Sequence, residues 1–230
     1  MTAMVSLHRH QLAWLTRSGW AAVLGRPWDA QARDCLAHWA MHRLPLVVTR
    51  QPAHPVTDEW IALGLPAPAR WGRRRLALQV PHAAVDGLGE FPRLADVQDL
   101  LPPPARDPLR ELLGRLRQCH AAARVFGSYG WQAISGLDHV RAASDLDLSV
   151  AVEGAAHADA VVRALGSFEV LQPRLDGELM FGDGAAVAWR EWAEWRAGRA
   201  RAVMVKRIDS VCLHRDAAWC GHTEPVEIAA

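Results

Sequence analysis

The sequence predicts an α+β fold built from mixed α/β sheets with helices packed on them. Several segments carry apolar residues at helical spacing, and other apolar runs are short and rich in valine and leucine, as buried strands are. Both kinds of segment occur throughout the 230 residues, so strands and helices are expected to share the same layers. Half of the residues are hydrophobic and 22% are charged, which fits folded domains with their own cores.

The first part of the chain is expected to form a smaller α/β domain over residues 1–95. Asp29 precedes a segment with apolar residues at helical spacing, which predicts a capped helix. Thr57 or Asp58 is expected to cap a short helix that ends before Pro66. The elements expected here are, in order, a helix or strand over 8–17, a helix over 30–43, a strand over 44–51, a helix over 59–65 and a strand over 73–80.

Three consecutive prolines, 102–104, form a stiff break in the chain. The boundary between the domains is therefore expected in the segment 90–106, and the second domain over residues 106–230. The elements expected there are a helix over 108–123 opened by Asp107 or Pro108, a short strand before Gly127, helices over 129–137 and 157–165, a strand over 145–152, shorter strands over 170–172, 178–181 and 185–189, a helix ending at Gly198, and extended segments over 202–208 and 211–213.

The bulk properties narrow the classes of function. A net charge of +1 argues against broad, sequence-independent binding to nucleic acid, which needs a concentrated basic surface. No apolar run is long enough to span a membrane, and the first residues do not resemble a secretory signal. None of the four cysteines lies in a Cys-x-x-Cys pair, which favours reduced thiols in a cytoplasmic protein.

The stretch Val125–Val150 carries the pattern that points to chemistry. Asp145 and Asp147 are two residues apart on an expected strand, so both side chains point to the same face. At this spacing of about 6–7 Å two carboxylates repel each other by roughly 2–3 kcal/mol at an effective dielectric near 20. A divalent cation turns that repulsion into affinity, and carboxylate and phosphate oxygens are the ligands that Mg²⁺ prefers. The pair therefore predicts a magnesium site.

Gly127 and Ser128 supply the second part of the pattern. A glycine directly after a strand lets the backbone turn tightly and approach a ligand closely. Ser128 is then expected near the N-terminus of a helix, where amide N–H groups and the helix dipole favour a phosphate. The turn is expected to hold a terminal phosphate while the aspartates hold the metal that bridges it.

A Gly-Ser turn followed by a strand with Asp-x-Asp resembles the polymerase-beta-like nucleotidyltransferase superfamily. The longer stretch GSYGWQAISGLDHVRAASDLDLSV is similar to the malonate decarboxylase holo-acyl-carrier-protein synthases, the phosphoribosyl-dephospho-CoA transferases. Three further stretches fit that family, namely LPLVVTRQ, DGELMFGDGAAVAWREW and VMVKR. The resemblance implies a nucleotidyltransferase-like second domain. The role of the first domain stays open, and its small size and position suggest only that it helps to shape the carrier-binding face and part of the donor's groove.

The resemblance also implies a reaction. The donor is 2′-(5″-triphosphoribosyl)-3′-dephospho-CoA, the acceptor is a serine of the acyl carrier protein of malonate decarboxylase, and pyrophosphate leaves. Members of the superfamily commonly use a third carboxylate, for which Glu178 is the first choice and Asp176 the second. Lys206, the one lysine of the chain, is expected to bind phosphates, or else to face solvent on an edge strand.

Two other functions stay open on the sequence alone. One is a different nucleotidyltransferase that moves an AMP-like group to a protein or a small molecule. The other is a non-catalytic module that only binds a nucleotide or a partner. The intact Gly-Ser and Asp-x-Asp elements favour an enzyme, since a degenerate fold tends to lose its metal ligands.

Overall fold

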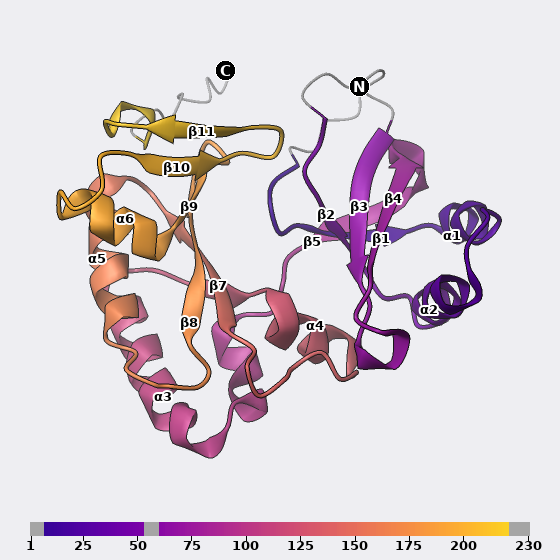
Figure 1. Ribbon diagram of the computed structural model, residues 1–230, viewed down its shortest axis with the longest axis horizontal. Helices are drawn as coiled ribbons and strands as arrows, with labels where there is room; N and C mark the ends of the chain where they lie inside the picture. Colours follow the sequence, from indigo (N-terminus) through magenta and orange to yellow (C-terminus); the bar gives the residue numbers. More distant parts are fainter. Residues whose placement is uncertain (1–6, 53–59, 221–230) are drawn as a thin grey trace, which may run out of the picture.

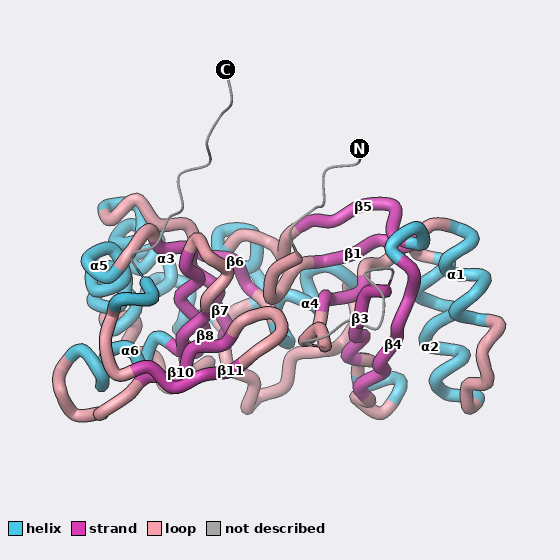
Figure 2. Tube along the Cα trace, turned by 90° about the horizontal axis from the view of Figure 1, so that it is seen from above, coloured by secondary structure: helices cyan, strands magenta, loops and turns pink. Residues whose placement is uncertain are grey.

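The computed structural model describes residues 7–52 and 60–220, and it divides into two halves that lie side by side (Figure 1). Each half contains one β-sheet, and most helices cover the outer side of that half. The view from above shows the same division, with helix α4 between the two sheets (Figure 2). Helices packed on two sheets, of which the second is mixed, confirm the predicted α+β class. No helix within the described ranges is long and apolar enough to cross a membrane.

The sheet of the first half has five strands in the order β4-β3-β2-β1-β5, and every recorded pair is antiparallel. Two helices pack beside it and bury Trp20, Leu36 and Trp39 in its core. The bounds are β1 (Leu12–Leu15), α1 (Arg17–Leu24), α2 (Ala30–Met41), β2 (Leu46–Val48), β3 (Trp60–Pro66), β4 (Arg75–Pro81) and β5 (Val85–Gly89).

Local signals predicted this half unevenly. Asp29 caps α2 as expected, because its side chain accepts a hydrogen bond of 2.9 Å from the N–H of Ala32. The helix predicted over 59–65 is wrong, since Trp60–Pro66 forms β3 between β2 and β4. A short apolar run is compatible with a helix or a strand, and here pairing with a strand on each side makes it a strand. The proposed caps Thr57 and Asp58 lie outside the described residues.

The sheet of the second half has six strands in the order β11-β10-β9-β8-β7-β6. Strands β7 and β8 are parallel, joined through α5, and their neighbours are antiparallel. The bounds are α3 (Pro103–Gln118), β6 (Ala123–Val125), α4 (Gly127–Ser135), β7 (Leu146–Val152), α5 (Ala155–Gly166), β8 (Leu175–Phe181), β9 (Ala186–Ala188), α6 (Trp189–Arg196), β10 (Val203–Lys206) and β11 (Val211–His214).

Three predictions in this half are corrected. Helix α3 begins at Pro103 rather than at Asp107 or Pro108, because prolines are tolerated in the first turn, where backbone N–H groups have no helical partner. The segment 170–172 is not a strand, and Leu171 is 94% exposed there. Strand β8 begins at Leu175, three residues before the predicted start.

Helix α4 ties the halves together. It begins at the Gly-Ser turn of the second half, yet Trp131 on this helix belongs to the core of the first half. The Trp131 ring is 4% exposed and meets the Phe91 ring edge-on at 5.4 Å. The turn proposed to bind phosphate is therefore held from both sides.

Replacing Trp131 with alanine is expected to lower the free energy of unfolding by about 3–5 kcal/mol, because it opens a cavity between the two halves. Trp60, which is 48% exposed, provides the matched control, and Trp60→Ala is expected to cost less than about 1 kcal/mol. Urea unfolding followed by circular dichroism measures both. Equal losses in the two variants would contradict the role given to Trp131.

Candidate functional site

The parallel pairing of β7 with β8 separates an apolar face from a polar face. On one face Leu146, Leu148 and Val150 pack into the core of the second half. On the other face the register places Asp147 opposite Asp176 and Ser149 opposite Glu178. Because side chains alternate along a strand, the polar residues point away from that core, toward the first half.

Asp147 lies at the centre of a carboxylate cluster. The pKa of Asp147 is raised from 3.8 to about 7, first by burial and then by the charges of Asp176 and Asp145. The Arg174 guanidinium opposes this shift. It donates to Asp145 at 2.7 and 3.2 Å and to Asp176 at 3.3 Å. Arg174 therefore binds Asp145 and Asp176 directly and acts on Asp147 only through its charge, so Asp147 has the most to gain from a further cation.

Gly127 stands directly against this cluster. Its φ is 62°, and a Cβ placed on it would lie 1.9 Å from Oδ2 of Asp147, so no other residue fits without a shift of the carboxylate. Along the turn, Gly130 is the first residue whose N–H has an acceptor, and it donates to the carbonyl of Phe126. Within the described residues the N–H groups of Gly127, Ser128 and Tyr129 have no acceptor. The turn thus presents free donors beside Asp147.

Glu178 belongs to a second cluster, which we call the Glu178 cluster. Its carboxylate accepts hydrogen bonds from Arg9 at 3.0 and 3.2 Å and from Lys206 at 2.9 Å, and it lies 2.8 Å from Nε2 of His10. Burial alone would raise the pKa of Glu178. The hydrogen bonds and charges of His10, Arg9 and Lys206 outweigh burial and hold that pKa well below its usual value.

The structure thus divides the seven sequence-predicted site residues between two neighbouring clusters. Gly127, Ser128, Asp145, Asp147 and Asp176 lie around the Gly-Ser turn and the start of the parallel strands. Glu178 and Lys206 bind each other in the Glu178 cluster.

The geometry favours Asp176 over Glu178 as the third carboxylate, and this choice stays a prediction. Asp176 faces Asp147 across the strand pair, whereas Glu178 is only 7% exposed and is bound by three side chains. Both residues lie on the same face of β8, so the sequence pattern did not separate them.

Sequence reasoning missed three basic residues of the site. Arg174 directly precedes β8, in the run RLDGE, and that position was the one signal for it. Arg9 and His10 come from the first half and meet Glu178 across 169 and 168 residues of chain, and no local pattern reports such a contact.

The acidic cluster fits a hard divalent cation. Within the described ranges no three His, Cys, Asp or Glu side chains are arranged to hold a metal by themselves. A magnesium ion at a phosphate site takes only one or two carboxylates and completes its shell with phosphate oxygens and water. The carboxylates of Asp147 and Asp145, which act on each other through their charges, and the N–H donors of the Gly-Ser turn match that requirement.

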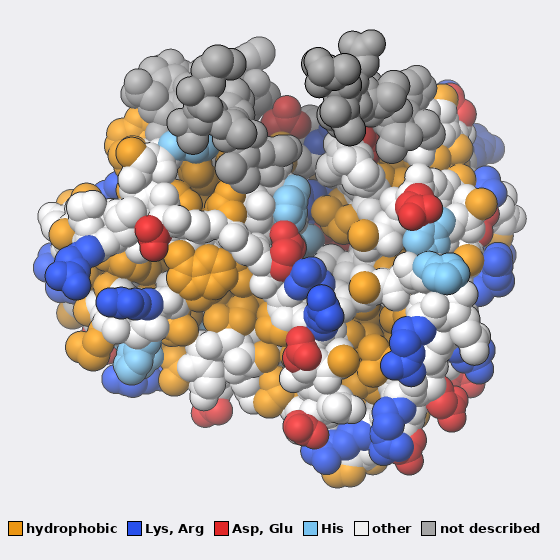
Figure 3. Space-filling view, turned by 180° about the vertical axis from the view of Figure 1, so that it is seen from behind, with side chains coloured by type: hydrophobic (Ala, Val, Ile, Leu, Met, Phe, Trp, Pro, Cys, Tyr) orange, Lys and Arg blue, Asp and Glu red, His pale blue; other side chains and the backbone are white. Residues whose placement is uncertain are grey.

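A groove of about 990 Å³ borders the Glu178 cluster. It is lined by Arg9 and His10 from the first half and by Ser149, Met180 and Arg207 from the second. Seen from behind, charged side chains and histidines gather along the line where the halves meet (Figure 3). The seven predicted residues do not line the groove itself, so it continues from the site rather than containing it.

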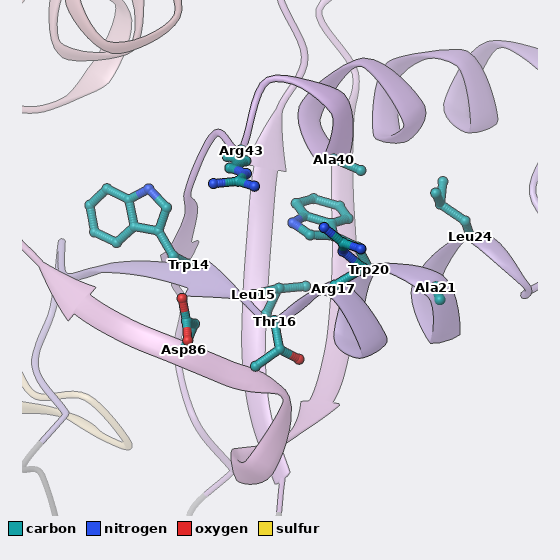
Figure 4. Close-up of a pocket in the computed structure, with 10 residues that line it drawn as sticks. All are labelled: Trp14, Leu15, Thr16, Arg17, Trp20, Ala21, Leu24, Ala40, Arg43 and Asp86. Atoms are coloured by element: carbon teal, nitrogen blue, oxygen red, sulfur yellow. The ribbon is translucent and has the colours of Figure 1, made fainter.

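A separate cleft of about 680 Å³ lies in the first half, where Trp14 and Trp20 stand near Arg17, Arg43 and Asp86 (Figure 4). None of the predicted site residues lines it. It therefore forms no part of the carboxylate site.

Comparison with known proteins covers both halves. Residues 8–91 match the model of the phosphoribosyl-dephospho-CoA transferase MdcG N-terminal domain, and residues 93–217 match that of the corresponding C-terminal domain. No solved structure matches the chain.

Three relatives carry the name phosphoribosyl-dephospho-CoA transferase. The protein from Bradyrhizobium diazoefficiens is 37% identical, over 89% of this chain and 88% of its own. The protein from Xanthomonas euvesicatoria is 38% identical, over 86% and 89%. The protein from Pseudomonas aeruginosa is 35% identical, over 75% and 78%.

Asp147→Asn is expected to stabilise the metal-free protein at pH 8 by on the order of 1–3 kcal/mol after allowance for solvent screening. The pKa of Asp147 is raised on folding, from 3.8 to about 7, so the ionised carboxylate destabilises the folded state. That penalty is absent below about pH 4 and complete above about pH 7, so the gain should fade as the pH is lowered.

Thermal unfolding between pH 4 and pH 8 measures this effect. Asp86→Asn is the control, because Asp86 is exposed and has no ion pair within the described residues, and it should change little. A loss of stability in Asp147→Asn at pH 8 would contradict the view that the ionised Asp147 carboxylate destabilises the folded protein.

Proposed function

The chain belongs to the phosphoribosyl-dephospho-CoA transferase family, and we propose that it attaches the prosthetic group of malonate decarboxylase. The donor is 2′-(5″-triphosphoribosyl)-3′-dephospho-CoA, and the acceptor is a serine of the acyl carrier protein. Pyrophosphate is released, and a phosphodiester joins the group to the carrier. The observation that carries this proposal is the contact of Gly127 with Asp147, which brings a phosphate-binding turn onto a carboxylate cluster.

The Gly-Ser turn would hold the donor's phosphates. The N–H groups of Gly127, Ser128 and Tyr129 have no acceptor in the described part of the chain, and the turn starts a nine-residue helix whose dipole favours negative charge. The Ser128 hydroxyl adds one donor. Since Trp131 anchors the same helix in the core of the first half, these donors are fixed before the substrate arrives.

Asp145 and Asp147 are the proposed ligands of Mg²⁺. Their geometry favours a cation, because burial and neighbouring carboxylates make the charge of Asp147 costly without one. When bound, the ion would neutralise the triphosphate and stabilise the departing pyrophosphate. Arg174 already brings positive charge to Asp145, so this part of the site is built to meet cations.

The reaction is an in-line displacement at the α-phosphorus. The carrier's serine oxygen bonds to that phosphorus, and the bond from phosphorus to the bridging oxygen of the pyrophosphate breaks. The hydroxyl's proton passes to a carboxylate, for which Asp176 is the proposed acceptor. Asp176 lies opposite Asp147 and is held in part by Arg174, while Glu178 is engaged with Arg9, His10 and Lys206.

Selectivity would come from the length of the donor. A pantetheine arm and an adenosine offer contacts far from the reacting phosphorus, and such remote binding energy orients the α-phosphate. The groove between the halves, with its volume of about 990 Å³, has room for these parts. ATP lacks the arm and should be a poor donor.

Purified protein with Mg²⁺, the triphosphoribosyl donor and the acyl carrier protein should give a carrier heavier by one phosphoribosyl-dephospho-CoA unit. Intact-mass spectrometry of the carrier reads this directly. Asp147→Asn should lower the rate of transfer by at least about a thousandfold, because it removes a metal ligand from the transition state. Asp86→Asn should transfer at the wild-type rate.

Efficient transfer of AMP from ATP, without use of the CoA-derived donor, would favour the alternative nucleotidyltransferase. Transfer at the wild-type rate by Asp147→Asn would contradict the assignment of the carboxylates. No transfer from either donor by wild-type protein would favour a binding module.

A further inference from the structure

The Glu178 cluster holds more positive charge than its one carboxylate balances. Glu178 supplies a single negative charge, while Arg9 and Lys206 supply two fixed positive charges and His10 lies against the same oxygen. The cations are more open than the anion, since the side chain of Glu178 is 8% exposed, that of Arg9 23% and that of Lys206 30%. The surplus positive charge is therefore more exposed to solvent than the carboxylate that it surrounds.

Several donors of the cluster are still free. Arg9 uses Nε and Nη2 on Glu178, and within the described residues its Nη1 has no acceptor. Lys206 makes one hydrogen bond there and carries three N–H groups. Charge-assisted hydrogen bonds from such groups are the strong ones, and phosphate oxygens are their usual partners.

His10 is held in a strained backbone conformation. Its φ is 62°, a region that residues other than glycine seldom adopt, and strain of this kind concentrates at functional sites. Its ring stacks on Phe126 at 3.9 Å and 21°, and its Nε2 lies 2.8 Å from Glu178. Phe126 immediately precedes the Gly-Ser turn. The strained residue thus connects the turn to the Glu178 cluster.

The cluster also lies at the right distance from the carboxylates. Glu178 follows Asp176 by two residues on the same face of β8, which corresponds to about 6–7 Å along the strand. Its register partner Ser149 follows Asp147 by the same step on β7. A phosphate chain that starts at Asp147 and runs along the strands therefore reaches Arg9, His10 and Lys206.

We propose that Arg9 and His10 of the first half join Lys206 to form the site for the leaving pyrophosphate. Glu178 is then a positioning residue, which holds the three basic side chains together. This inference rests on the proposed function, since it identifies which part of that donor the cluster binds. It gives the first half a direct place in the active site, because the leaving group is bound by residues from both halves.

Binding of inorganic pyrophosphate in the presence of Mg²⁺, measured by isothermal titration calorimetry on the full chain, tests the proposal. Arg9→Ala should weaken binding at least tenfold, because it removes a charged fork. Arg9→Lys keeps the charge without the fork and should lose less than Arg9→Ala. Arg17→Ala is the matched control, since Arg17 lies in the same half in the separate cleft and should leave the affinity within twofold of wild type.

His10→Gly separates binding from stability. Glycine adopts a positive φ without strain, which offsets part of the lost ring contacts, so the thermal midpoint should change little while pyrophosphate binding weakens at least fivefold. Folded Arg9→Ala and His10→Gly proteins with wild-type affinity would overturn the proposal. An equal loss in Arg17→Ala would also overturn it, because binding would then follow total charge alone.

The same titration is independent of the donor's identity, because it contains neither donor nor carrier. A carrier that gains the expected mass, together with unchanged pyrophosphate affinity in the Arg9 and His10 variants, would refute this inference alone. Normal pyrophosphate binding that depends on Arg9, with no use of the CoA-derived donor, would refute the proposed function and leave the leaving-group site in place.

Discussion

The parallel register of β7 and β8 is the constraint on which the site depends. It fixes Asp147 opposite Asp176 and Ser149 opposite Glu178, on the face of the strand pair that does not pack into the core of the second half. Strand geometry does not let these carboxylates move apart, so their repulsion persists in the folded protein. The raised pKa of Asp147 is the mark of that repulsion and of burial.

Two neighbouring clusters of opposite character follow from this register. Around Asp147 negative charge exceeds positive charge, although the charge of Arg174 opposes the raised pKa of Asp147. One step along the strands, around Glu178, positive charge exceeds negative. A magnesium–triphosphate substrate has the complementary arrangement, with a metal at one end of a polyanion. The Gly-Ser turn stands next to the acidic cluster and is held by Trp131 from the first half.

The sequence predicted those features that local spacing encodes. The turn at Gly127, the cap at Asp29 and the mutual influence of the Asp145 and Asp147 charges each depend on residues a few positions apart. Features set by distant partners were missed or misassigned. Segment 59–65 became a strand because β2 and β4 pair with it, and Arg9 and His10 reach Glu178 only through the packing of the two halves. The choice between Asp176 and Glu178 depended on those same contacts.

The central claim is that β7 and β8 carry a metal site and, next to it, a pyrophosphate site. Its most direct test is anomalous diffraction from Mn²⁺ in crystals of the full chain grown with pyrophosphate. The account predicts a metal peak beside Asp145 and Asp147, with the pyrophosphate extending from the Gly-Ser turn to Arg9 and Lys206. A metal peak away from both aspartates, or pyrophosphate bound only in the cleft of Trp14 and Trp20, would contradict it.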